Sequence, residues 1–98
     1  MDESILFEEV KNKLNITWED IDTNNKIKMI IKDAVATLNH KLGADVDYSE
    51  NGLEHQLFLN YCLYSYNNAL HEFDKNYMND IYQLRIKYEV QQYENKQL

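Results

Sequence analysis

The side chains best suited to metal or redox chemistry in this sequence are three histidines and one cysteine. His40, His55 and His71 have no histidine or cysteine partner four residues away, whereas a metal site needs several converging ligands. Cys62 is the only cysteine and lies in the most apolar part of the chain, where burial suppresses thiol reactivity. The sequence therefore predicts solvent-facing or structural histidines, a core cysteine, and no metal or cofactor.

Two acidic segments match the beginning of a calcium-binding EF-hand loop. Residues 20–24 and residues 45–49 carry oxygen-bearing side chains at the first, third and fifth ligand positions. The sixth position must be glycine for a sharp turn, yet it holds Asn25 in one segment and Glu50 in the other. Neither segment has the glutamate required at the twelfth position. These acids are interpreted as helix caps and solvated surface groups.

Motifs for catalysis are missing from the sequence. It contains no glycine-rich phosphate loop, no Gly-x-Ser-x-Gly turn and no His-Glu-x-x-His pair. We therefore expect that the protein is not an enzyme. Seventeen acidic against ten basic residues give a net charge of -7, which disfavours binding to nucleic-acid phosphates. No apolar run is long enough to cross a bilayer and residues 1–9 do not resemble a secretion signal, so we expect a soluble protein made in the cytosol.

The scarcity of turn-forming residues predicts an all-α protein. There is no proline, and the two glycines, Gly43 and Gly52, are too few for the closely spaced turns of a sandwich or barrel. The 98 residues suffice for one domain. We expect a small bundle of about four helices in residues 1–90. Residues 91–98 are polar and without periodicity, which predicts a flexible, disordered C-terminal tail.

Apolar spacing locates the first two helices. Residues 4–14 predict a short helix, and residues 15–22 predict a loop anchored by the aromatic ring of Trp18. One of three polar residues is expected to cap the second helix, namely Asp20, Asp22 or Thr23. That helix carries apolar residues three and four apart and ends at Gly43, where a left-handed residue stops a helix. Residues 44–51 are polar and predict a surface loop.

The second half of the chain has a different apolar pattern. From Leu53 to Leu70 apolar and aromatic side chains lie on nearly every side of the expected third helix, which predicts that another protein chain covers part of it. A fourth helix is expected after Phe73, capped by Asp74 or Asn76. Residues 84–90 alternate with a period of two that would equally suit a strand. Six of the eight tyrosines fall in these two helices, where they either fill the core or form a seam between chains.

Several short motifs from Val10 to Val90 resemble, in their order and spacing, the head-to-tail connector (adaptor) proteins of long-tailed bacteriophages and prophages. Each motif is a capped helix or an aromatic pair, and the resemblance depends on their succession along the chain. The motifs are Ile16-Thr17-Trp18-Glu19-Asp20 before Asp22, Ile30-Ile31, Leu42-Gly43, Asp47-Tyr48, Leu57-Phe58 with Tyr61 and Tyr64, Asn68-Ala69-Leu70, Phe73, Asn76-Tyr77, Leu84-Arg85 and Tyr88-Glu89-Val90.

The resemblance implies a structural virion protein that forms a homo-oligomeric ring of about a dozen copies beneath the portal protein. Such a ring extends the DNA channel without binding DNA specifically and offers a platform for a head-completion, stopper or tail protein. It implies localisation at the head–tail interface of the virion, assembly in the host cytoplasm, and no membrane contact. The portal-docking residues implied are Tyr88, Val90, Gln91, Gln92 and Tyr93. The subunit-interface candidates are Phe58, Tyr61, Tyr64, Tyr66, Tyr77 and Tyr82.

An alternative function comes from the acidic composition. A phage or prophage regulatory protein, such as an antirepressor or a DNA mimic, would use carboxylates in place of phosphates to occupy a basic partner. Such a mimic requires acids in rows along one exposed face. The acids of this sequence instead gather at expected helix starts and in loops, as helix capping requires.

Overall fold

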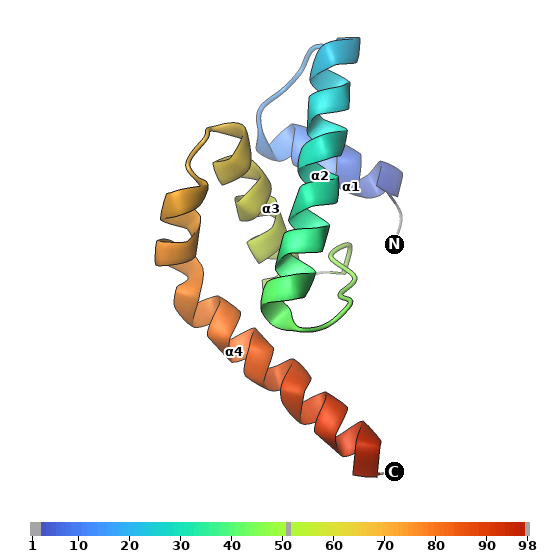
Figure 1. Ribbon diagram of the computed structural model, residues 1–98. Helices are drawn as coiled ribbons and strands as arrows, with labels where there is room; N and C mark the ends of the chain where they lie inside the picture. The colour runs from blue at the N-terminus through green and yellow to red at the C-terminus, as the bar shows by residue number, and fades with distance from the viewer. Residues whose placement is uncertain (1–2, 51, 98) are drawn as a thin grey trace.

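Over the residues that the structure describes, the protein is all-α and has four helices (Figure 1). The computed structural model describes residues 3–50 and 52–97. The helices are α1 (Glu3–Lys13), α2 (Ile21–Leu42), α3 (Leu53–Tyr66) and α4 (Leu70–Gln97). The first three helices pack together, and α4 crosses α2 and α3 before its last turns extend past them. This extension makes the molecule elongated, with extents of 50 × 28 × 18 Å.

The loop between α1 and α2 is anchored by Ile16 and not by Trp18. Ile16 is buried, and its backbone N–H donates to the carbonyl oxygen of Lys11 at 3.0 Å. Trp18 is 51% exposed, so its predicted role as the aromatic anchor is wrong. The reason is local: a left-handed backbone at Asn15, with φ of 60°, turns Ile16 back toward the core.

Helix α2 has the two ends that its sequence predicts. The side chain of Asp20 accepts a hydrogen bond from the backbone N–H of Thr23, so Asp20 is the residue that caps the helix. Gly43 follows the last turn at a φ of 70°, and its N–H donates to the carbonyl of Asn39. Between these ends, one face of α2 lies buried in the core, formed by Ile27, Ile30, Ala34, Leu38 and Leu42.

The segment after Gly43 contributes to the core, although its composition predicts a surface loop. Val46 and Tyr48 are buried, and the Tyr48 ring stacks on Phe58 with the ring centroids 5.3 Å apart. The Tyr48 hydroxyl donates to Oδ1 of Asn39 at 2.8 Å, which satisfies the polar end of the buried ring. Val46 and Tyr48 are too few apolar side chains among residues 44–50 for the sequence to predict that this segment packs on the bundle.

Helix α3 is covered mainly by its own chain. One face is buried, formed by His55, Leu57, Phe58, Tyr61 and Cys62. Leu59, Leu63, Tyr64 and Tyr66 are half-buried against the core cluster, while Leu53 is exposed. The helix is therefore not surrounded on all sides, and the neighbouring helices cover most of its apolar surface.

Helix α4 begins before, and ends after, the predicted bounds. It starts at Leu70, ahead of the expected caps Asp74 and Asn76, because Asn68 at a φ of 57° reverses the chain directly after α3. It includes residues 84–90, so the strand alternative is excluded. The predicted disorder of residues 91–98 is also wrong, since residues 91–97 are helical and Leu98 lies outside the described residues. No proline or glycine interrupts this stretch, and the Gln92 side chain holds it to the end of α2.

Candidate interaction surfaces

An aromatic cluster fixes the beginning of α4 to α3. The ring of Phe73 is fully buried and contacts Tyr61 edge-on, with the ring centroids 5.0 Å apart. Tyr77 stacks on Phe73 at 4.9 Å and meets Tyr64 edge-on at 5.8 Å. The amide of Asn76 donates to the Tyr64 hydroxyl at 3.1 Å. In this cluster the tyrosines pack between α3 and α4 of the same chain.

Glu54 at the start of α3 fixes the middle of α4. Its carboxylate accepts hydrogen bonds from the Tyr88 hydroxyl and from Nζ of Lys87, the latter at 2.9 Å. Burial tends to raise the pKa of Glu54, but the hydrogen bonds from Tyr88 and Lys87 outweigh it, and the pKa lies below its ordinary value of 4.5. Burial and the Glu54 carboxylate both raise the pKa of Tyr88, so its phenol remains the donor.

Two further contacts connect α4 to the end of α2. Nζ of Lys41 lies 3.0 Å from a carboxylate oxygen of Asp74. Further along α4, the side-chain amide of Gln92 donates a hydrogen bond to the carbonyl oxygen of Gly43 at 2.8 Å. Together with the Glu54 contacts they fix the rotation of α4 about its own axis, and so determine which of its faces points to solvent.

The side of α4 that points to solvent carries exposed apolar side chains interspersed with charged ones, among them Lys75 and Glu89. Five side chains, here called the outer stripe, recur at spacings of four, four, four and three residues along the helix. Their mean direction lies roughly 170° from that of Phe73, Tyr77, Leu84 and Tyr88 on the inner face, at 3.6 residues per turn. The outer stripe and its exposures are Met78 65%, Tyr82 64%, Ile86 43%, Val90 49% and Tyr93 65%. Helix α4 thus carries apolar side chains on two opposite sides, and its own chain covers only one.

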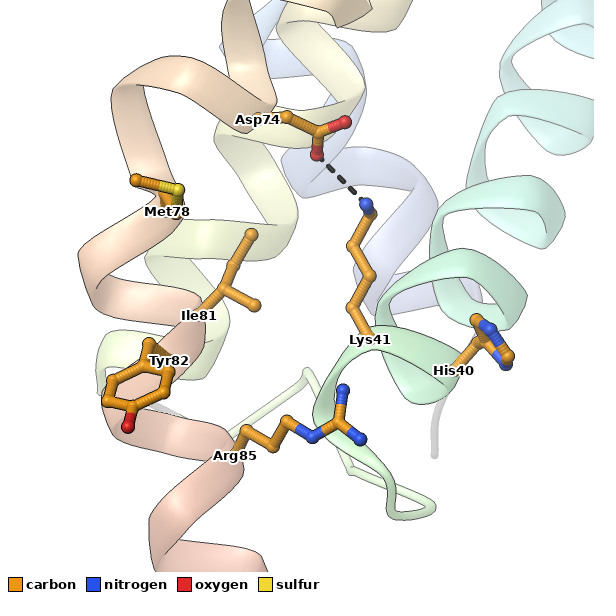
Figure 2. Close-up of a pocket in the computed structure, with 7 residues that line it drawn as sticks. All are labelled: His40, Lys41, Asp74, Met78, Ile81, Tyr82 and Arg85. Carbon is orange, nitrogen blue, oxygen red and sulfur yellow. Dashed lines mark ion pairs between the residues drawn. The ribbon is translucent and has the colours of Figure 1, made fainter.

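A cleft of about 430 Å³ lies beside the proximal part of the outer stripe, between α4 and the end of α2 (Figure 2). Figure 2 shows Lys41 reaching from α2 toward Asp74, with Ile81 and Arg85 on the α4 side. Met78 and Tyr82 form the outer edge of the cleft. The apolar surface of α4 therefore continues into a shallow depression lined by charged groups.

A second groove, of about 920 Å³, runs between α1 and residues 24–36 of α2. Phe7, Ile31 and Val35 are half-buried in its walls, above the fully buried Leu6. Lysines and an acid also line it: Lys28 and Lys32 come from α2, and Glu8 comes from α1. Nζ of Lys28 lies 6.0 Å from the centre of the Phe7 ring. We call this the α1–α2 groove.

The structure separates the residues that the resemblance implies for portal docking. Val90, Gln91, Gln92 and Tyr93 are exposed near the end of α4. Tyr88 is half-buried and bonded to Glu54, so it supports the helix from inside.

The six subunit-interface candidates are also divided. Phe58 and Tyr61 are buried within the chain, and Tyr82 lies on the outer stripe. Tyr64 and Tyr77 belong to the aromatic cluster, and Tyr66 is half-buried with Nζ of Lys26 4.9 Å from its ring centre. Met78, Ile86 and the α1–α2 groove were not predicted from the sequence. The four-residue spacing of Met78, Tyr82, Ile86 and Val90 is the signal that could have identified the outer stripe.

The histidines and the cysteine have structural or surface positions. Nδ1 of His55 lies 2.7 Å from the carbonyl oxygen of Tyr48, and its Nε2 lies 2.7 Å from a carboxylate oxygen of Glu9. His40 and His71 are exposed, and Cys62 is buried. In residues 3–50 and 52–97, no three or more His, Cys, Asp or Glu side chains are grouped so that they could hold a metal ion. Among the helices of the same residues, none is both long and apolar enough to span a membrane.

Comparison of the chain with protein-family models, with curated proteins and with solved structures finds no match.

Proposed function

We propose that the protein is a structural virion protein, a ring-forming head–tail connector that docks beneath the portal of a tailed bacteriophage. The observation that supports this best is the outer stripe, five exposed apolar side chains over about four turns of a firmly held helix. Exposed apolar side chains that gather on one side of a helix are typical of protein–protein contacts in folded proteins. A subunit whose role is assembly needs such a surface and needs no catalytic group.

The two ends of the outer stripe serve different contacts in this proposal. Val90 and Tyr93 lie on the last turns of α4, which extend past the other helices (Figure 1), so a large partner can reach them without meeting the bundle. We assign this distal end, with the exposed amide of Gln91, to the portal protein. Met78 and Tyr82 lie beside the bundle at the edge of the cleft (Figure 2), with Ile86 one helical turn further along α4, and we assign this end to neighbouring subunits of the ring.

The alternative, an acidic DNA mimic, is less well supported by the arrangement of charges. Several acids that would form a phosphate-like row are instead paired with bases of the same chain. The pairs are Lys11–Glu19, Lys41–Asp74, Lys87–Glu54 and Arg85–Glu89. Pairing reduces the negative field that a basic partner would recognise. The net charge of -7 is compatible with a connector, because an acidic channel does not retain passing DNA.

The test is binding to the portal protein encoded in the same genome, measured by native mass spectrometry and sedimentation velocity. The wild type is expected to form rings or to join the portal ring. The double variant Val90→Glu/Tyr93→Glu should bind the portal at least about tenfold more weakly, because two charges replace apolar contacts. Gln83→Glu, on a polar flank of the same helix, is the matched control and should bind normally. A wild-type chain that stays monomeric and never binds the portal would refute the connector function.

A further inference from the structure

We propose that His55 takes up a proton as the protein folds, and that its imidazolium forms a pH-sensitive latch that holds α1 against α3. The latch is independent of the connector function. Its basis is the position of two oxygen atoms around one buried ring.

Both ring nitrogens of His55 face an oxygen atom that accepts hydrogen bonds. The residue is only 6% exposed. Its Nδ1 lies 2.7 Å from the carbonyl oxygen of Tyr48, and its Nε2 lies 2.7 Å from a carboxylate oxygen of Glu9. A neutral imidazole has one N–H and one lone pair, so it can donate to only one of these oxygens. The other nitrogen would then face an oxygen at 2.7 Å with no proton between them, which is repulsive.

One additional proton on the pair of His55 and Glu9 satisfies both contacts. It resides either on the imidazole, which then donates from both nitrogens, or on the carboxyl group, which then donates to Nε2. Carboxyl groups release their protons at a lower pH than imidazoles do, so the proton belongs to the ring. The Glu9 side chain is also 33% exposed, which lets water solvate its charge. The pair is therefore an imidazolium and a carboxylate.

The other charged groups near the ring do not oppose a cation there. They are Glu9 of α1, Asp45 and Glu50 of the segment before α3, Glu54 of α3, and Lys87 of α4. Lys87 is bonded to Glu54, which compensates its charge. The hydroxyls of Tyr48 and Tyr88 stay neutral, because burial raises the pKa of both. Burial of the ring disfavours the charged form, whereas the two hydrogen bonds that only the imidazolium makes favour it.

Loss of this proton is expected to release α1 first. One N–H then remains on His55, and the contact with the Tyr48 carbonyl is the buried one. The Glu9 carboxylate is partly exposed and can turn to water. The stabilisation by the latch is complete below about pH 6.5, where histidine in the unfolded chain also holds its proton. It is lost as the pH rises and the folded protein gives up the proton.

Glu9→Gln is the variant that separates the proton from the contact. Its side-chain amide can donate to Nε2 of a neutral ring, so the contact with His55 persists without the additional proton. Glu8→Gln removes the same charge from an exposed neighbouring position on α1 and is the matched control. Groups that titrate equally in all three proteins, such as His40 and Cys62, cancel in the comparison.

Nuclear magnetic resonance of the ring nitrogens tests the protonation state directly. At pH 7.5 about nine-tenths of ordinary histidines are neutral. We expect both nitrogens of His55 to carry a proton at this pH in the wild type and in Glu8→Gln, and only one to do so in Glu9→Gln. A wild-type ring with one unprotonated nitrogen would overturn the proposal, and this spectrum decides the matter even if Glu9→Gln fails to fold.

Urea unfolding and hydrogen exchange test the latch. From pH 6 to pH 8 the equilibrium constant for unfolding should rise roughly tenfold more in the wild type and in Glu8→Gln than in Glu9→Gln, since one proton contributes up to about tenfold per pH unit. Over the same range, the protection of α1 amides from exchange, corrected for intrinsic rates, should fall in the wild type and stay constant in Glu9→Gln. Equal pH dependence of the wild type and Glu9→Gln in either measurement would overturn the latch.

Discussion

Removal of the Tyr88 hydroxyl is expected to loosen α4 from α3. Tyr88→Phe keeps the ring packed and deletes the donor that Glu54 accepts, while Lys87 remains bound to the same carboxylate. A hydrogen bond to a charged group contributes about 1.5–3 kcal/mol. Because the Glu54 side chain is partly solvated and keeps Lys87, we expect the lower value, about 1.5 kcal/mol.

Urea unfolding followed by circular dichroism, at one fixed protein concentration, measures this loss. With a slope near 1 kcal/mol per M for a small domain, the midpoint should fall by about 1.5 M. Tyr82→Phe is the matched control, since the same change on the exposed face of the same helix should alter stability by less than about 0.5 kcal/mol.

A double-mutant cycle with Glu54→Gln tests the cause of the loss. If the hydroxyl stabilises the fold through the carboxylate, the coupling between the two changes should be about 1 kcal/mol or more, because the residues are in direct contact. Additive effects, or a Tyr88→Phe midpoint equal to that of the Tyr82→Phe control, would refute the account of how α4 is held.

Three further predictions concern the same fold. The pKa of Glu54 is lower in the folded protein than its ordinary 4.5, so the stabilisation it provides is present above pH 4.5 and is lost as the pH falls through the folded pKa. In urea titrations, the unfolding midpoint of the wild type should therefore exceed that of Glu54→Gln by less at pH 3 than at pH 7. An equal difference between the two midpoints at both pH values would contradict this. Gly43→Ala should lower the free energy of unfolding by about 1 kcal/mol, because alanine is strained at a φ of 70° although no atom lies within 4 Å of the added methyl group. Gly43→Asn should lower the free energy of unfolding by less, since asparagine tolerates the left-handed conformation better. Equal stability of all three proteins would argue against a left-handed cap. Burial raises the pKa of the Cys62 thiol to about 12, so a thiol reagent at neutral pH should label the native protein only as fast as the helices around Cys62 unfold locally. Labelling of the native protein as fast as of the urea-unfolded protein would show that the thiol is accessible.

Local sequence patterns were sufficient for α2. Its apolar residues at three- and four-residue spacing and the terminal Gly43 act through contacts within a few residues, so the sequence alone predicts them; it narrowed the cap to Asp20, Asp22 or Thr23, and the structure identifies Asp20. The same holds for the all-α class, which follows from the absence of proline and the scarcity of glycine.

Features that depend on distant contacts were predicted less well. Tyr48 is buried because Phe58 and Asn39 receive its ring and hydroxyl, and nothing in the polar segment around it reveals those partners. Residues 91–97 have no apolar periodicity, yet they remain helical as a continuation of α4, with Gln92 held by Gly43 forty-nine residues earlier in the chain. Both errors have one cause: side chains far apart in sequence contribute part of the stabilisation.

The candidate site divides in the same way. The sequence alone determined that the second half of the chain holds more apolar and aromatic side chains than one helix face can bury, because composition and spacing suffice for that statement. Only the tertiary structure decided that the uncovered surface lies on α4 and not on α3. The rotation of α4 about its axis is set by Glu54, Lys41 and Gly43, which lie outside that helix. Because these contacts hold one side of α4 against the bundle, the apolar side chains on the opposite side remain exposed.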